Sequence, residues 1–242
     1  MLRRIDPAGL PVDDLLALYL SDRRQVEGRP WVALNFISSA DGGTAIDGKS
    51  SRLGDEDDKA VFQALRSVPD IIMVGAGTVE AEDYRPVALD AARRERRVAA
   101  GLTEVPVLAI VSGRLSFDTE RRVFSDPEHR PMVITGPEAD PAKLAMLGDA
   151  ADVIILEELT VTGILARLGA ARVILCEGGP SLAGQFVAAG LVDELNLTIS
   201  PKLVGGGSPR IAKGPAADPP IDMRLDRVLA GERSLFLRYL RE

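Results

Sequence analysis

The stretch Arg172-Val-Ile-Leu-Cys-Glu-Gly-Gly-Pro-Ser-Leu-Ala-Gly-Gln-Phe186 passes from a predicted strand, through two glycines, into a predicted helix. Residues 172–176 form a short apolar run rich in β-branched side chains, which is typical of a buried central strand. Pro180 and Ser181 suit a first helical turn, and the apolar residues after them recur at helical spacing. The stretch therefore predicts a strand–turn–helix unit of an α/β fold.

The turn of this unit is Gly178-Gly179, directly after Glu177. Adjacent glycines allow positive φ and let a ligand's phosphates approach the backbone, where helix N–H groups and the helix dipole hold negative charge. Glu177, at the carboxyl end of the strand, can accept hydrogen bonds from a second ligand. A tight turn without a ligand is the alternative interpretation of a single glycine pair.

A second turn of the same design lies earlier in the chain, in Asp70-Ile-Ile-Met-Val-Gly-Ala-Gly-Thr-Val79. An apolar strand ends in Gly75-Ala-Gly77, and Thr78 begins a short helix. This is not the dinucleotide fingerprint, since Glu80 stands where the third glycine would be. Ligands of open α/β sheets lie across the carboxyl ends of the strands, so two such turns favour one extended ligand.

Composition narrows the possible chemistry. The chain has 242 residues, 46% of them hydrophobic, and no run of 18 apolar residues, so we expect no membrane span. Its N-terminus lacks the apolar core of a signal peptide, so we expect a cytoplasmic protein. The net charge of −7 and the dispersed basic residues argue against nucleic-acid binding. Cys176 is the single cysteine and His129 the single histidine, so neither a metal site nor a histidine-based triad is expected. An organic cofactor is favoured.

The remaining pattern predicts one domain, residues 1–242, in which residues 1–29 are an N-terminal helical extension with a helix at 10–20. Strands and helices alternate between residues 70 and 190, which predicts a mainly parallel sheet with helices on both faces. A basic helix at 91–100 is expected to present a solvated face. Residues 193–200 alternate polar and apolar side chains as a half-exposed strand does, and 223–229 with 235–240 predict a terminal antiparallel hairpin.

Four motifs carry a resemblance to a known family: Asn35-x-x-Ser38-Ser-Ala-Asp41-Gly42, Val74-Gly-Ala-Gly-Thr-Val79, Glu177-Gly-Gly-Pro-Ser-Leu182 and Asp193-Glu-Leu195. In this order they resemble the signature set of the riboflavin-biosynthesis pyrimidine reductases, the reductase domain of the bifunctional deaminase/reductase. The likeness runs from about residue 30 to 240 and lacks the deaminase's zinc motif, so it implies a stand-alone reductase. It implies a dihydrofolate-reductase-like fold, a three-layer α/β/α arrangement with a mixed, mainly parallel central sheet and a C-terminal antiparallel hairpin.

The resemblance also implies site residues. NADPH is expected against the two glycine turns and at a few further positions, namely Gly75, Gly77, Thr78, Gly178, Gly179, Pro180, Ser181, Leu182 and Ala183, with Ile37, Ser38 and Glu82. Ser51 and Arg66 match positions that hold the substrate's sugar phosphate, and Glu177 matches the carboxylate that binds the pyrimidine. From the sequence alone, a salt bridge of Arg66 with Asp58 or Asp70 is the alternative.

Two positions depart from the family pattern on the substrate side. Asn35 stands where members commonly carry a lysine that points at the substrate, and Gly43 stands where lysine is frequent. A neutral amide supplies no cation. The expected reaction is NADPH-dependent reduction of 5-amino-6-(5-phosphoribosylamino)uracil to the ribitylamino product. The alternatives are reduction of a related pterin-type substrate such as dihydrofolate, or a nucleotide-binding protein without turnover.

A hydride reductase of this kind holds both partners in position and excludes water. A proton must also be delivered, and Asp41 or Glu177, acting through water, are the candidates. For Asp41, stabilising its own Asp-Gly turn is the alternative role.

Two further expectations concern cofactor preference and assembly. Ser112 and Arg114 follow a strand end where the adenosine half is expected, and they can grip a 2′-phosphate, which favours NADPH over NADH. A homodimer is expected because the terminal strands collect apolar side chains on one face. These residues are Leu195, Leu197, Ile199, Leu235, Leu237 and Tyr239.

Overall fold

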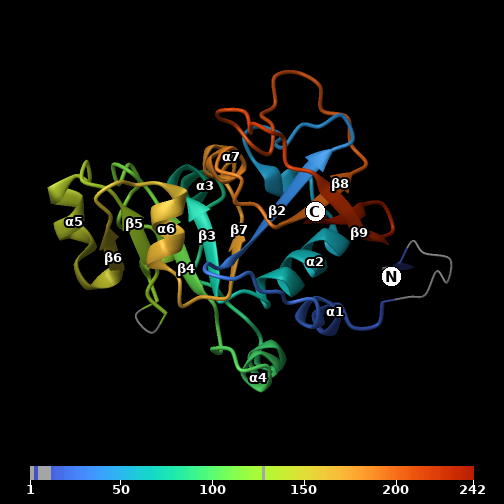
Figure 1. The fold of residues 1–242 in the computed structure, drawn as a ribbon, viewed down its shortest axis with the longest axis horizontal. Coiled ribbons are helices and arrows are strands. Elements are labelled where there is room, and N and C mark those ends of the chain that lie inside the picture. Colours follow the sequence, from blue (N-terminus) through green and yellow to red (C-terminus); the bar gives the residue numbers. More distant parts are fainter. Residues whose placement is uncertain (1–2, 5–11, 127–128) are drawn as a thin grey trace.

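A computed structural model describes residues 3–4, 12–126 and 129–242. In this part of the chain, ten strands form one sheet in the order β1-β9-β10-β8-β2-β7-β3-β4-β5-β6 (Figure 1). The strands are β1 (Arg3–Arg4), β2 (Trp31–Ser39), β3 (Ile71–Gly75), β4 (Val107–Val111), β5 (Met132–Thr135), β6 (Asp152–Ile155), β7 (Val173–Cys176), β8 (Glu194–Ser200), β9 (Met223–Ala230) and β10 (Leu235–Arg241). Every pairing from β8 to β6 is parallel, and β1, β9 and β10 join antiparallel. The expected mixed, mainly parallel sheet with a terminal hairpin is confirmed.

The helices are α1 (Leu15–Ser21), α2 (Glu56–Arg66), α3 (Ala76–Ala81), α4 (Ala91–Ala99), α5 (Pro141–Leu147), α6 (Val161–Arg167) and α7 (Pro180–Ala188). Helices α6 and α7 pack over one face of the central strands, and α1 and α2 pack over the other face beside β2 and β7. Helices α3 and α5 belong to a third cluster against β3, β4 and β5. These are the expected helical layers on both sides of the sheet.

Strand β7 is the buried centre that the opening stretch predicts. All four of its residues are buried, and it pairs in parallel with β2 on one side and β3 on the other. Because β3 and β7 are neighbours, their carboxyl ends, and therefore the two glycine turns, lie side by side although they are about 100 residues apart in sequence.

Polar and apolar side chains alternate along strand β8 as predicted, but here the polar side chains are the buried ones. Its polar residues, from Glu194 to Ser200, are buried, and the apolar residues between them are only partly buried. The reason lies on the α1/α2 face, where the Glu194 carboxylate receives two hydrogen bonds from the buried Arg238 guanidinium, at 3.0 and 2.9 Å. The apolar side of β8 faces away from these helices.

The basic helix α4 corrects one expectation. Arg97 does not contribute to a solvated face, because its side chain is fully buried and donates to the carbonyls of Ser67, Pro69 and Thr103 at 2.8 to 3.0 Å. Burial lowers the pKa of Arg97 to about 10. The helix expected at 10–20 begins only at Leu15, after the N-cap Asp14, and residues 10–11 of that expectation lie outside the described residues.

Candidate active site at the two glycine turns

The two glycine turns contact each other directly. The Gly75 amide donates to the Gly178 carbonyl at 2.7 Å, and a Cβ on Gly75 would lie 3.3 Å from the Gly179 amide nitrogen. A Cβ on Gly179 would lie 2.6 Å from Thr78 Oγ1. The two turns thus lie too close together for a side chain at Gly75 or Gly179, and this close approach explains why both positions are glycine.

Only one of the two glycines in Gly178-Gly179 needs the left-handed region. Gly178 has φ +94°, whereas Gly179, the N-cap of α7, has φ −70°. The expectation of positive φ therefore holds for Gly178 alone. The peptide bond between the two residues is cis.

A pocket of about 1030 Å³ opens beside these turns. This volume is at the upper end of the roughly 300–1,000 Å³ found for small-molecule sites, so it suits a cofactor together with a substrate. The first turn of α7 faces it through Pro180, Ser181 and Leu182, and the backbone N–H groups of Ser181 and Leu182 have no partner within the helix. Bare backbone beside a helix N-terminus is a fitting cradle for a dinucleotide pyrophosphate.

Glu177 precedes the Gly178-Gly179 turn and lines the pocket, and its carboxylate accepts three hydrogen bonds. Arg66 donates from Nε to Oε1 at 2.8 Å and from Nη2 to Oε2 at 2.6 Å, and the Tyr84 hydroxyl donates to Oε2 at 2.7 Å. The Glu177 side chain is only 2% exposed. The Arg66 guanidinium lies 4.3 Å from the centre of the Phe62 ring and 5.3 Å from that of Tyr84, so two aromatic rings contact the cation.

The electrostatics of this cluster follow from its burial. Burial alone would lower the pKa of Arg66, but the Glu177 charge and its hydrogen bonds raise that pKa above its usual value. Burial, and then the nearby Glu177 carboxylate, raise the pKa of Tyr84 well above its usual value. Arg66 is therefore a fixed cation, and Tyr84 a fixed hydroxyl donor.

Helix α2 supplies the wall of the pocket with residues four positions apart, Asp58, Phe62 and Arg66. Asp58 lies in the first turn, opposite Thr198 of β8, which also lines the pocket. Burial raises the pKa of the Asp58 carboxyl, the Thr198 hydroxyl lowers it by a hydrogen bond, and the charge of Asp55 raises it further. A carboxyl group thus faces the pocket on the side where Asn35 also lies.

Two loops that are distant in sequence meet over the pocket. The Ser208 hydroxyl accepts from the amides of Thr44 and Ala45 at 2.9 and 3.1 Å, and the Thr44 hydroxyl donates to the Pro209 carbonyl. Glu82, expected as a cofactor contact, accepts from the amide and the hydroxyl of Ser50 at 2.6 and 2.7 Å. The loop at 44–54 is therefore tied down on both sides.

Most of the residues expected from the sequence lie in this pocket. Those that line it are Asn35, Ile37, Ser51, Arg66, Gly75, Gly77, Thr78, Glu82, Ser112, Glu177, Gly179, Pro180, Ser181 and Leu182. Five expected residues do not line the described pocket, namely Ser38, Asp41, Arg114, Gly178 and Ala183. The sequence reasoning missed Asp58, Phe62, Tyr84 and Thr198.

Asp41 lies where its alternative role predicts. Its carboxylate accepts from the Ser39 hydroxyl at 2.5 Å and from the amides of Val204 and Gly205, so it fastens the turn to the loop after β8. The Ser39 hydroxyl and these amides lower the pKa of Asp41 to about 2. Its position outside the pocket does not support the expectation that it passes a proton to the substrate.

Arg114 and Ser112 differ in their surroundings. Ser112 is buried at the pocket wall, whereas the Arg114 side chain is 82% exposed and lies 3.5 Å from Glu138. Arg66, expected at a phosphate, pairs with Glu177, and Asp70 pairs with Arg23. Neither ion pair that the sequence offered for Arg66 is the one that forms.

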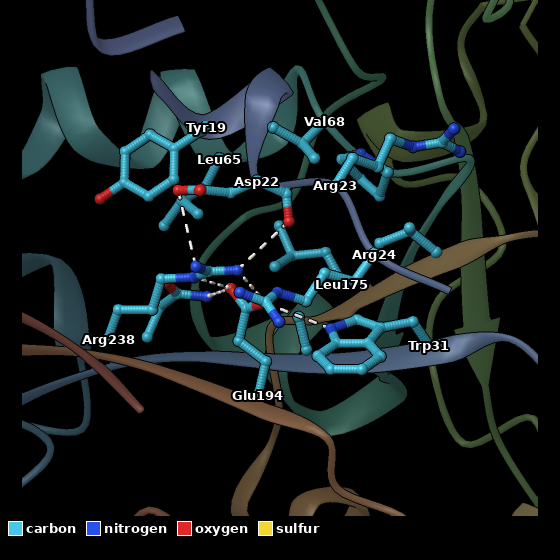
Figure 2. A pocket seen from close by; sticks show the side chains of 14 residues that line it. Tyr19, Asp22, Arg23, Arg24, Trp31, Leu65, Val68, Leu175, Glu194 and Arg238 are labelled. Carbon is cyan, nitrogen blue, oxygen red and sulfur yellow. Dashed lines mark hydrogen bonds and ion pairs between the residues drawn. The ribbon is translucent and has the colours of Figure 1, made fainter. Parts of the chain in front are cut away.

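A second, much smaller cavity of about 30 Å³ lies near the amino ends of β2 and β7 (Figure 2). It has room for about one water molecule. Charged side chains at its wall are paired with one another, because Arg238 donates hydrogen bonds to Glu194 and Asp226. The Trp31 indole also donates to Glu194, at 3.1 Å. Its size restricts it to a structural role.

Other reactive groups are few in the described part of the chain. Cys176 is fully buried behind Glu177, and burial raises the pKa of its thiol to about 12. No described helix is long and apolar enough to cross a membrane, and the described residues include no cluster of three metal-binding side chains.

Comparison with known proteins agrees with this geometry. Residues 30–235 match the model of the RibD C-terminal domain. The chain belongs to the RibD C-terminal domain family. A relative from Archaeoglobus fulgidus, named 2,5-diamino-6-ribosylamino-4(3H)-pyrimidinone 5′-phosphate reductase, is 32% identical over 193 residues, which are 77% of this chain and 87% of the relative.

Solved structures extend the likeness to the whole fold. A pyrimidine reductase-like protein from Corynebacterium diphtheriae superposes with a TM-score of 0.78 at 28% identity, covering 88% of this chain and 92% of that one. A dihydrofolate reductase from Enterococcus faecalis gives a TM-score of 0.51 at 14% identity over 88% of this chain and 96% of its own, a likeness of fold alone. This member of the RibD C-terminal domain family thus has the dihydrofolate-reductase-like fold that its motifs imply.

Proposed function

We propose that the protein uses NADPH to reduce the ribosylamino group of a phosphorylated aminopyrimidine to a ribitylamino group. The observation that carries this proposal is one pocket in which two glycine turns and the buried carboxylate of Glu177 meet. The names of relatives support the substrate class, as with the pyrimidinone 5′-phosphate reductases of Archaeoglobus fulgidus and Methanothermobacter thermautotrophicus.

The cofactor side is proposed to run along the two turns. The pyrophosphate would lie against Gly179 and the first turn of α7, with Thr78 beside it, because N–H groups and a close backbone are available there. Gly75, Gly77, Pro180, Ser181 and Leu182 complete the cradle, and Ile37 lies further along the pocket. When bound, the reduced nicotinamide supplies a hydride.

The substrate side is proposed to lie between α2 and Glu177. Phe62 lines this end of the pocket with the Arg66 guanidinium over its ring, and Glu177 offers an acceptor for an N–H group of a heterocycle. Ser51 and Asn35 line the same end of the pocket and can hydrogen-bond the sugar. Of the two carboxylates expected to pass a proton, only Glu177 lines the pocket, and the three hydrogen bonds that it accepts from Arg66 and Tyr84 favour a role in holding the substrate over delivery of a proton.

Water exclusion is the remaining requirement of hydride chemistry, and the loops that meet over the pocket suit it. The contacts of Ser208 with Thr44 and Ala45, and of Glu82 with Ser50, hold these loops in place. A closed pocket strengthens each hydrogen bond to the bound ligands.

An assay with purified protein tests the proposal. NADPH oxidation should depend on a ribosylamino-pyrimidine phosphate. The assay uses two forms of it, one with an amino group and one with an oxo group at C2 of the ring, and either is expected to support turnover. Tight NADPH binding without turnover of any substrate would favour the nucleotide-binding protein without activity.

A pterin-type substrate is a second candidate, favoured by Asp58 and Asn35. The pocket wall has a neutral amide at Asn35 and a carboxyl at Asp58, so it suits a planar ring with several N–H donors. Dihydrofolate in the same assay separates the two, since only one substrate class should support turnover.

We also propose a homodimer. Cross-strand pairs Leu195–Tyr239, Leu197–Leu237 and Ile199–Leu235 form one apolar surface on the side of β8 and β10 that faces away from α1 and α2. Leu235 is 39% exposed there. Surfaces of this kind are usually covered by a partner, and a second copy with the same surface satisfies twofold symmetry.

A further inference from the structure

The segment between β8 and β9 meets the loop at 44–54 (Figure 1). The Ser208 hydroxyl accepts from the amides of Thr44 and Ala45 at 2.9 and 3.1 Å, and it donates to the Ala45 carbonyl at 3.2 Å. The Thr44 hydroxyl donates to the Pro209 carbonyl at 2.9 Å, and Thr44, Ala45 and Pro209 all line the pocket. This segment therefore holds the loop that carries Ser51 at the end of the pocket proposed for the substrate.

Gly43 shows how closely the segment and the loop approach each other. A Cβ at this position would lie 2.3 Å from Val204 Cγ2 and 3.0 Å from Ser208 Cβ. In addition, the Asp41 carboxylate accepts from the amides of Val204 and Gly205. The glycine at position 43 is thus explained by the segment that packs against it.

Further along, the same segment is docked on α7. The Lys213 amide donates to the carbonyl of Pro180, in the first turn of α7, at 2.9 Å. A Cβ on Gly184 would lie 2.1 Å from the Lys213 carbonyl oxygen. Glycine weakens a helix interior, and here it permits the close approach of the Lys213 backbone. The segment therefore also touches the helix whose first turn is the proposed cofactor cradle.

These contacts place one hydrogen-bonded segment between the cofactor cradle and the substrate loop. We propose that residues 202–214 form a brace that couples the two: a dinucleotide bound at the first turn of α7 orders the loop at 44–54 and raises the affinity for the substrate. Ser208 is the positioning residue of this brace. The inference rests on the proposed function and deepens it. Such coupling is reciprocal, so the substrate raises the affinity for the cofactor by the same factor.

The cofactor acts through its preference for the docked brace. The Lys213 amide binds the Pro180 carbonyl and so fixes the first helical turn, whose N–H groups are proposed to receive the pyrophosphate. A dinucleotide therefore favours the arrangement in which Lys213 is docked. The same arrangement keeps Ser208 against Thr44 and Ala45.

Hydrogen exchange with NADP⁺ alone tests the brace without any substrate. The reporter is the exchange of the amides of residues 46–54, which lie beyond the two amides that Ser208 accepts from. In the wild type, NADP⁺ should slow this exchange by at least about fivefold, because a coupled loop opens less often. In Ser208→Ala the same cofactor should still bind, but the slowing should be lost. A loop protected by direct contact with NADP⁺ would keep its protection in Ser208→Ala and would overturn the inference.

A second variant breaks the brace at its other end. Gly184→Ala pushes Lys213 away from α7 and should also abolish the protection of residues 46–54, although alanine is the better helix former. The control is Ser125→Ala, which removes an exposed hydroxyl that donates to the Arg122 carbonyl outside the pocket. It should retain the full protection. Melting temperatures establish that each variant is folded.

The coupling itself is measured with NADP⁺ and the ribosylamino-pyrimidine phosphate, which do not react because the oxidised cofactor has no hydride to give. NADP⁺ should lower the Kd of the wild type for this substrate by at least about fivefold, and in Ser208→Ala the factor should fall to about one. A merely structural role of Ser208 would weaken the binding of each ligand alone and leave the factor unchanged.

The outcomes separate this inference from the proposed function. Protection and coupling in a wild type that does not oxidise NADPH would refute the function and leave the inference standing. Turnover by a wild type whose residues 46–54 gain no protection would do the reverse. Failure of the wild type to bind NADP⁺, or equal substrate affinity with and without it, also overturns the inference.

Discussion

Thr78 Oγ1 stands 2.6 Å from the position that a Cβ on Gly179 would occupy, so the first turn of α3 and the N-cap of α7 are in contact. This contact joins two turns that the sequence separates by about 100 residues. It also makes each of them sensitive to the side chain of the other.

Gly179→Ala should weaken NADPH binding, because the added methyl group displaces Thr78 and fills the space beside the α7 N-terminus. We expect a loss of about 100-fold in affinity, or about 2.7 kcal/mol. The double variant Thr78→Ala with Gly179→Ala should recover most of the thermal stability, since the clash is removed. Fluorescence titration and melting curves on the same preparations measure both effects; wild-type affinity in folded Gly179→Ala would remove this turn from the cofactor site.

Cofactor preference tests the adenosine end of the pocket. NADPH should bind more tightly than NADH, and Arg114→Ala should reduce that difference, because the Arg114 side chain, two residues after Ser112, is exposed and can exchange its contact with Glu138 for one with a 2′-phosphate. Glu138→Gln, which removes the neighbouring carboxylate at 3.5 Å, is the matched variant and should leave or increase the preference. Equal titration curves for the two cofactors in the wild type would refute the assignment.

Asp58 predicts a measurable dependence of stability on pH. Burial raises its pKa above the ordinary 3.8, so the folded protein binds this proton more tightly than the unfolded chain. Its charged form therefore costs stability, and stability falls as the pH rises from 3.8 through the folded pKa. Asp58→Asn removes that cost and should raise the denaturation midpoint near neutral pH.

The matched control for Asp58 is Glu56→Gln, in the same helical turn, where the side chain is 88% exposed. It should leave the pH dependence as in the wild type. If Asp58→Asn shifts neither the midpoint nor its pH dependence, the carboxyl group does not carry the burial cost. A simultaneous loss of substrate affinity in Asp58→Asn would show that the pocket retains this carboxyl for function.

The sequence predicted the two glycine turns but not the ion pair of Arg66 with Glu177. Glycines at strand ends carry their own signal, and the alternation of strands and helices implied that both turns lie at one edge of the sheet. The partner of Arg66 was not predictable in this way. Asp58 and Arg66 are eight residues apart on α2, about 12 Å along the helix, whereas Glu177 is brought to Arg66 by the placement of β7 between β2 and β3.

Tyr84 and Thr198 were missed for the same reason. Each lies in a segment whose local pattern carries no chemistry, and only the sheet order brings them to the pocket. For Arg97 the basic pattern of α4 was misleading, because long arginine stems can be buried when carbonyl groups receive the guanidinium. The arginine-rich sequence of α4 does not reveal which cation faces inward.

The apolar surface of β8 and β10 predicts the assembly. Leu197 and Leu237 are directly opposite each other at its centre, so Leu237→Arg would place a charge where a second copy is expected to pack. Light scattering at micromolar concentration should give a dimer of about twice 25.8 kDa for the wild type and a monomer for the variant. Met146→Arg on α5 is the control, because Met146 is 63% exposed and lies outside this surface. A wild-type protein that remains monomeric, or a Leu237→Arg protein that remains dimeric, would show that this surface is not the interface.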